Sequence, residues 1–160
     1  MKELLLLLFF IPNLVMADYF CPKELETKDL RKDYLNFIIS RLEEKFISKI
    51  EIPPPHEIKK MDTYLNDKFN EESFGKAYYN KFYPAYEVQK AFSEVKETLL
   101  YSNPEMLKIL KFSMNMQKMK EALISYKERN STSDLKIKDI AYSFGLWNTM
   151  IEDLGACASK

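Results

Sequence analysis

The sequence predicts an all-α fold, a single domain of about five helices arranged as a bundle or as an irregular helical array. Apolar residues recur at three- and four-residue steps over most of the chain, a spacing that places them on one face of a helix. Valine is scarce and there are only three glycines, whereas Lys, Glu, Leu and Met are plentiful, and such a composition favours helices over strands. In addition, no stretch alternates cleanly between apolar and polar residues, and the sequence has no Asn-Gly or Asp-Gly hairpin turn.

The first seventeen residues have the pattern of a cleavable export signal. A basic start is followed by an apolar run from Leu4 to Ile11, and small residues precede a cleavage position at Asp18. A membrane anchor or a buried N-terminal helix is the alternative, but a spanning helix needs about 20 apolar residues. We therefore expect a signal peptide over residues 1–17 and an exported domain, periplasmic or secreted, over 18–160. We expect no transmembrane segment in the mature chain.

Two cysteines lie at opposite ends of this expected domain. Cys21 and Cys157 most economically form one intramolecular disulfide in an exported protein, because the compartment is oxidising. Such a bond would close a very long loop, for which the chain-entropy model gives about 5 kcal/mol as an upper figure. Two free thiols or an intermolecular bridge are the alternatives.

The first helix is expected to begin near Lys23, behind Pro22, and to continue to about Ile50. Its predicted core stripe consists of Leu30, Tyr34, Phe37, Ile38, Leu42, Phe46 and Ile50. Three consecutive prolines at 53–55 end it, since proline lacks a backbone donor and disfavours helix in the residue before it. A second helix is predicted over residues 56–69.

A third helix is expected to follow Pro84, with Val88, Phe92, Val95 and Leu99 in register. Asn103 and Pro104 predict the start of a fourth helix, because Asn is a good cap and proline is tolerated at the first helical position. The apolar stripes of this helix contain Leu107, Leu110, Met114, Met116, Met119 and Leu123, and it is expected to end near Glu128.

The last helix is expected over Leu135–Leu154, after a polar loop that begins at Asn130. Gly145 is expected to bend or break this helix, and Gly155 is expected to stop it.

The charge balance excludes some classes of function. The 24 basic and 24 acidic residues cancel, whereas a dedicated nucleic-acid binder normally has a basic excess. The usual nucleotide, redox, haem and zinc motifs are absent, so we expect no cofactor and no nucleic-acid partner. The lone histidine, His56, has no neighbouring ligand in sequence, so no metal site is expected.

An aromatic segment from Phe74 to Tyr86 is the strongest candidate for a binding surface. It contains six aromatic residues in thirteen positions, and tyrosine combines a large apolar area with a polar tip. One interpretation is a core plug that includes Phe74, Phe82 and Tyr78, and the other is a partly exposed recognition patch. A split role combines them, with the phenylalanines inward and Tyr79, Tyr83 and Tyr86 outward. The candidate partner-binding residues are Tyr78, Tyr79, Tyr83 and Tyr86.

Three methionines on the fourth helix raise a second possibility. The spacing of Met114, Met116 and Met119 suits a soft ion such as Cu(I), which an exported protein could carry. However, at about 100° per residue Met114 points away from Met116, and methionine commonly fills gaps in cores. We therefore interpret all three as core residues, and a small-ligand or Cu(I) carrier is kept as an alternative function.

A cell-wall hydrolase with paired carboxylates is a second alternative, because that chemistry needs no histidine. The candidate carboxylates are Glu43, Glu44, Asp62, Asp67, Glu71 and Glu72. Charged residues along amphipathic helices normally form the solvated face. We therefore expect a binding function rather than an enzymatic one: an exported helical interaction protein whose partner is a protein or a component of the cell envelope.

Overall fold

The structure, a computed structural model, describes residues 21–51, 56 and 76–159, with the side chains of 76–81 left out of the description. The predicted signal peptide and nearly all of the predicted second helix lie outside these residues. Every regular element within them is helical, and the elements are η1 (Lys23–Leu25), α2 (Lys28–Lys45), η2 (Ile47–Lys49), α5 (Lys76–Glu97), α6 (Glu105–Arg129) and α7 (Ile137–Ala158). The all-α class is confirmed, with four α-helices in the described part where the sequence predicted about five overall.

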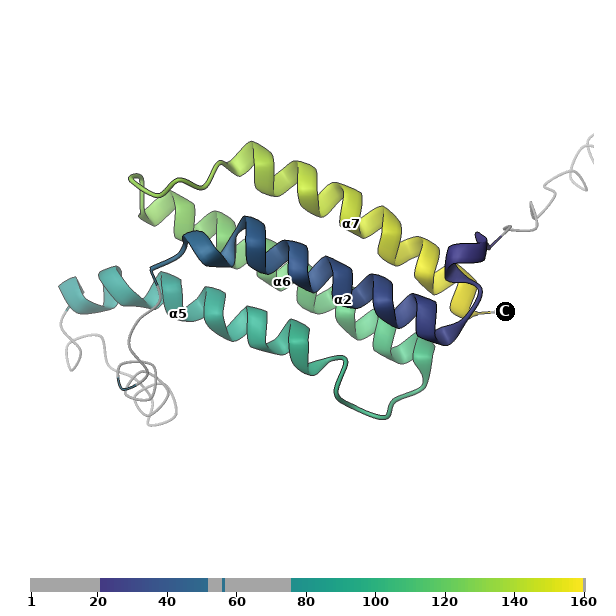
Figure 1. Cartoon of the computed structure of the whole chain (residues 1–160). Helices are drawn as coiled ribbons and strands as arrows, with labels where there is room; N and C mark the ends of the chain where they lie inside the picture. Colours follow the sequence, from purple (N-terminus) through teal and green to yellow (C-terminus); the bar gives the residue numbers. More distant parts are fainter. Residues whose placement is uncertain (1–20, 52–55, 57–75, 160) are drawn as a thin grey trace, which may run out of the picture.

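The four helices form a bundle in which successive helices run in opposite directions (Figure 1). Helix α6 packs against both α5 and α7, and α2 contacts α7. All four helices contribute to one core, and its fully buried side chains include Ile38, Leu42, Val88, Val95, Phe112, Met116, Met119, Leu123, Ile140, Phe144 and Leu154.

Aromatic rings join the C-terminal end of α2 to α7. The ring centroid of Phe46 lies 6.2 Å from that of Phe144 and 6.0 Å from that of Trp147. Phe144 and Trp147 contact each other edge to face at 5.2 Å. Such pairs stabilise a core beyond the area that they bury.

The first predicted helix is divided into three parts. The side-chain oxygen of Thr27 accepts a hydrogen bond from the backbone N–H of Leu30 at 3.2 Å and caps α2, which separates it from η1. The predicted stripe was also partly wrong, because Leu30 is 38% exposed and Phe37 is 48% exposed. The core-facing side of α2 instead carries Arg31, Leu35, Ile38 and Leu42.

The prediction that a helix begins after Pro84 was wrong. Helix α5 begins at Lys76 and continues through Pro84, which is buried. Proline costs a helix interior a backbone hydrogen bond. The residues that follow, Ala85 and Val88, are 2% and 0% exposed, so burial of this side of the helix offsets that loss.

Helix α6 matches its predicted bounds closely, but its predicted stripes separate into two faces. Met116, Met119 and Leu123 are fully buried, as predicted for core residues. The other predicted core residues are exposed, Leu107 by 51%, Leu110 by 58% and Met114 by 59%. At about 100° per residue, these three lie on the side of the helix opposite the core.

The start of α6 also differs from the prediction in detail. Pro104 occupies the cap position, no side-chain cap hydrogen bond is formed there, and the first helical residue is Glu105. The helix therefore begins one residue later than predicted.

Neither glycine interrupts α7. The helix is continuous through Gly145 and Gly155 and ends at Ala158, so Gly145 does not break it and the predicted stop at Gly155 was wrong. The buried stripe of α7 extends across both glycines, and its members are Ile140, Phe144, Trp147, Ile151, Leu154 and Cys157. This packing outweighs the roughly 1 kcal/mol by which glycine disfavours a helix interior.

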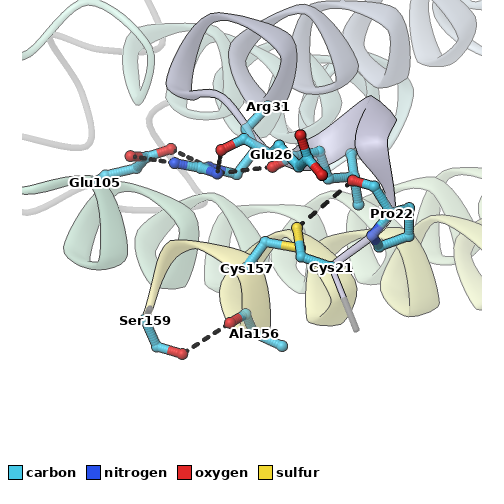
Figure 2. Close-up of a disulfide and its surroundings, with 9 residues drawn as sticks. Cys21, Pro22, Glu26, Arg31, Glu105, Ala156, Cys157 and Ser159 are labelled. Carbon is cyan, nitrogen blue, oxygen red and sulfur yellow. Dashed lines mark hydrogen bonds and ion pairs between the residues drawn. A yellow bond between two sulfur atoms is a disulfide. The ribbon is translucent and has the colours of Figure 1, made fainter. Parts of the chain in front are cut away.

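A disulfide joins Cys21 to Cys157, as predicted (Figure 2). It connects the segment before η1 to the last turn of α7, with the two Cα atoms 5.4 Å apart. Arg31 lies near this bond and links α2 to the start of α6 (Figure 2). Its Nη2 donates to Glu105 at 3.0 Å, and its Nη1 donates to the backbone oxygen of Leu25 at 2.7 Å.

Candidate functional site

The structure separates the tyrosines of the predicted binding segment. Tyr83 is partly exposed, whereas Tyr86 is only 3% exposed, and their ring centroids lie 6.1 Å apart. Tyr78 and Tyr79 belong to α5, but their side chains lie outside the description. The expectation that Tyr86 faces outward was therefore wrong, because the segment is part of a regular helix that turns this residue inward.

A groove along α5 and α6 begins at Tyr83. Its volume is about 380 Å³, and its lining comprises Tyr83, Glu87, Lys90, Ala91, Glu94, Lys118, Glu121, Ala122 and Ser125. We call this feature the α5–α6 groove.

The register between the two helices places small residues in the floor of the groove. Lys118 Nζ contacts Glu94 Oε2 at 2.9 Å, and further along the pair Asn115 Nδ2 donates to Thr98 Oγ1 at 2.9 Å. In antiparallel helices with this register, Ala91 lies opposite Ala122. Two facing alanines leave space that larger side chains would fill, which is the physical origin of the groove.

Asn115 fixes this register from inside the bundle. The residue is 5% exposed, and its Nδ2 also donates to the backbone oxygen of Glu94 at 2.8 Å. Thr98 Oγ1 donates to the same oxygen at 2.9 Å. Because buried polar groups are costly unless they are hydrogen-bonded, other alignments of α5 and α6 are disfavoured.

Each rim of the groove carries polar groups at helical spacing. Glu87, Lys90 and Glu94 follow one another along α5 at steps of three and four residues. On α6 the corresponding side chains are Lys118, Glu121 and Ser125. The groove therefore presents both signs of charge along its length, above an apolar floor. A binding segment with complementary charges could pair with both rims.

The geometry gives less support to the two alternative functions, a Cu(I) carrier and a hydrolase with paired carboxylates. Met116 and Met119 are fully buried while Met114 is exposed, so the three thioethers do not converge. Glu43 and Glu44 are exposed on α2, and Glu44 pairs with Arg41 at 2.7 Å. The remaining candidate carboxylates lie outside the described residues. Within the described part of the chain, no group of three or more His, Cys, Asp or Glu side chains is placed to hold a metal ion.

Sequence reasoning identified Tyr83 but missed the charged residues of the groove. The available signal was the spacing by three and four residues that places Ala91 between Glu87 and Glu94, and Ala122 between Lys118 and Ser125. Their alignment depends on the register between two helices, which the pattern of one helix does not contain.

None of the helices described here has both the length and the apolar character needed to cross a membrane. No family model, curated protein or solved structure matches the chain.

Proposed function

We propose that this chain is an exported helical interaction protein that binds a helical segment of a protein partner in the α5–α6 groove. The observation that carries this proposal is the combination of an alanine floor with charged rims of both signs. Small floor residues allow another helix to approach closely, and complementary charges give such a contact its specificity.

The chemistry of the groove defines the expected partner. Its lining contains three glutamates and two lysines, and one glutamate, Glu94, pairs with Lys118. A fitting segment would present a small or flat apolar side to Ala91 and Ala122. It would carry a basic residue toward Glu87 or Glu121 and an acidic residue toward Lys90. Tyr83 adds an aromatic contact at one end, and Tyr78 and Tyr79 stay predicted contacts.

The disulfide supports the exported location. Structural disulfides persist in secreted and periplasmic proteins and are rare in the reducing cytosol. Intact-mass analysis of the protein from its own cells should find a chain that begins at Asp18 and carries one disulfide. A product that retains Met1 and two reduced thiols would contradict export.

Site-specific photo-crosslinking tests the groove directly. A photo-crosslinking amino acid in place of Lys90, within the groove, should capture a discrete partner in the compartment where the protein matures. The same amino acid at Glu97, which is exposed on α5 outside the groove, serves as the control. Capture from both positions alike, or from neither, would contradict the proposal.

Filling the groove provides the second arm of the test. Ala122→Leu should weaken the captured complex by about tenfold or more, because the new side chain occupies the space of the partner. Ala141→Leu is the matched control, since Ala141 is exposed on α7 away from the groove. Thermal melts of both variants show whether each remains folded.

A further inference from the structure

Six large apolar side chains are exposed together at one end of the bundle. They occupy the turn between α5 and α6 and the first three turns of α6 (Figure 1). The set comprises Leu100 (77% exposed), Tyr101 (53%), Met106 (44%), Leu107 (51%), Leu110 (58%) and Met114 (59%). We call it the α6 apolar surface. Leu107, Leu110 and Met114 are neighbours on one face of α6 at steps of three and four residues, and contiguous exposed apolar residues mark a binding site more often than scattered ones do.

The core does not account for this surface. Ile109, Phe112 and Met116 fill the inward side of the same turns, and each is at most 4% exposed. Leu107, Leu110 and Met114 follow at steps of three and four residues on the opposite side. The helix is therefore apolar on two opposite faces over this length, and only one of them is used for folding.

Basic residues outnumber acidic ones beside the α6 apolar surface, although Glu97 directly precedes the turn. From Thr98 to Lys120 the chain carries four lysines and one acidic residue, Glu105. The carboxylate of Glu105 is already engaged by Arg31. Lys118 pairs with Glu94 at 2.9 Å, whereas no carboxylate among the described residues forms an ion pair with Lys108, Lys111 or Lys120.

Lys111 connects the charge to the apolar side chains. It is exposed, and its Nζ lies 5.5 Å from the centroid of the Tyr101 ring. It lies one turn after Leu107 and one turn before Met114 on α6. Apolar side chains with lysine at their margin are typical of surfaces that sit at a bilayer interface, where the apolar groups enter and the ammonium groups stay with the headgroups.

We propose that the α6 apolar surface docks onto an anionic lipid bilayer. Leu100, Leu107 and Leu110 enter the boundary between headgroups and acyl chains, and Tyr101 sits at headgroup depth. Lys111 meets the lipid phosphates, so binding depends on charge as well as on apolar area. This inference is independent of the proposed function, because neither the six apolar residues of this surface nor Lys111 line the α5–α6 groove.

Charge complementarity favours a membrane over a second copy of the chain. A symmetric dimer through this surface would place each basic segment against its own copy, and like charges in an interface are unfavourable. An anionic bilayer satisfies both the apolar side chains and the lysines.

Vesicle co-sedimentation of the purified full chain, as its cells produce it, tests the proposal. The protein should sediment with vesicles of phosphatidylcholine and phosphatidylglycerol in equal parts, and added salt should weaken this binding. It should bind vesicles of phosphatidylcholine alone at least about tenfold more weakly. Absence of binding to the anionic vesicles, or equal binding to both compositions, would overturn the proposal.

Substitutions within the surface locate the contact. Leu107→Ser with Leu110→Ser should reduce vesicle binding by about tenfold or more, and Lys111→Glu should reduce it similarly. Leu146→Ser is the matched control, because Leu146 is 52% exposed on α7 and lies outside the surface. If this control loses as much binding as the α6 variants, the assigned surface is wrong.

Fluorescence gives a readout that does not depend on sedimentation. Leu110→Trp places an indole within the surface, whereas the native Trp147 is 6% exposed. Brominated lipids should quench the new indole and leave Trp147 unaffected. Sedimentation equilibrium without lipid completes the test, since a dimer that the Leu107→Ser and Leu110→Ser substitutions dissolve would mean that a second copy covers the surface.

Discussion

At the scale of single residues, Arg31 shows how a charge can occupy a core-facing position. It takes the place on α2 where the apolar stripe would continue, yet it is only 8% exposed. Hydrogen bonds to Glu105 and to the backbone oxygens of Leu25 and Glu26 satisfy its guanidinium group. Because the pairing is bidentate, it holds α2 and α6 in a defined orientation.

The contact between Arg31 and Glu105 shifts the pKa of both side chains. The hydrogen bond from Arg31 lowers the pKa of Glu105 below its ordinary value of 4.5, and the charges of Lys28 and Lys108 lower it further against the opposing effect of burial. In return, the hydrogen bond to Glu105 raises the pKa of Arg31.

Glu105 should therefore make the free energy of unfolding depend on pH. Since folding lowers its pKa, the ionised carboxylate stabilises the folded state above about pH 4.5, and this contribution is lost as the pH falls through the lower pKa of the folded protein. Glu105→Gln should reduce the free energy of unfolding by about 2–3 kcal/mol at neutral pH, with a shrinking difference in acid. Urea unfolding at several pH values measures this.

Glu44→Gln is the control for that experiment. The side chain of Glu44 is 67% exposed, and that of its partner Arg41 is 50% exposed. Because exposed ion pairs contribute little, the substitution should change the free energy of unfolding by less than about 1 kcal/mol. A pH-independent difference between Glu105→Gln and the wild type would contradict the assigned role of the carboxylate.

Substitution by alanine should affect stability at Tyr86 and partner binding at Tyr83. Tyr86→Ala removes a ring that is 3% exposed, and it should lower the free energy of unfolding by about 3 kcal/mol. Tyr83→Ala should cost less than about 1 kcal/mol, because that side chain is partly exposed, but it should weaken partner capture. Thermal melts and crosslinking yields of the two variants separate packing from binding, and equal destabilisation would argue against this division.

At the scale of elements, apolar spacing predicted where helices form better than it predicted which side they bury. The bounds of α6 follow from its uninterrupted spacing and from Pro104. The same spacing led to the wrong prediction that Leu110 and Met114 are core residues, because both faces of this part of the helix are apolar. Which face packs inward depends on α5 and α7, and the pattern of α6 alone does not specify its neighbours.

Proline and glycine gave the least reliable signals. Pro84 was predicted to begin a helix and Gly155 to end one, but both lie within helices. Each local preference is worth only a few kcal/mol at most, whereas the side chains around these positions bury large apolar areas. The floor of the α5–α6 groove was not predicted for a related reason, since it arises only when two helices are aligned.

We expect the hydrogen bonds of Asn115 to stabilise the alignment of α5 with α6. Asn115→Ala leaves the backbone oxygen of Glu94 and the hydroxyl of Thr98 with fewer partners, and it should reduce the free energy of unfolding by about 1–3 kcal/mol. Gln117→Ala, at an exposed position of α6, should change it by less than about 0.5 kcal/mol. Urea unfolding of the two variants checks this, and equal values would contradict a specific role for Asn115.

At the scale of the whole molecule, the bundle is fastened at one end by two different contacts. The Cys21–Cys157 disulfide ties the segment before η1 to the last turn of α7, and the Arg31–Glu105 pair ties α2 to the start of α6 (Figure 2). The cysteine pairing was predictable because the sequence contains only two cysteines. The ion pair was not, since its partners are far apart in the sequence and each helix contains several charges.

Loss of the disulfide should weaken the fold without changing the oligomeric state. Replacing both cysteines with serine should reduce the free energy of unfolding by about 2–5 kcal/mol, because the unfolded chain regains the freedom that a sequence separation of 136 residues had restricted. Treating the wild type with a reductant should lower its melting temperature to that of the variant. A dimer that disappears on reduction would contradict the intramolecular bond.

The disulfide also makes most of the polypeptide a closed ring. One peptide-bond cleavage anywhere between Cys21 and Cys157 opens that ring but does not release a fragment, because both pieces stay covalently attached through sulfur. A protein that meets proteases outside the cytoplasm would thus tolerate a first cut without losing mass, and only a second cut or a reductant would separate its parts.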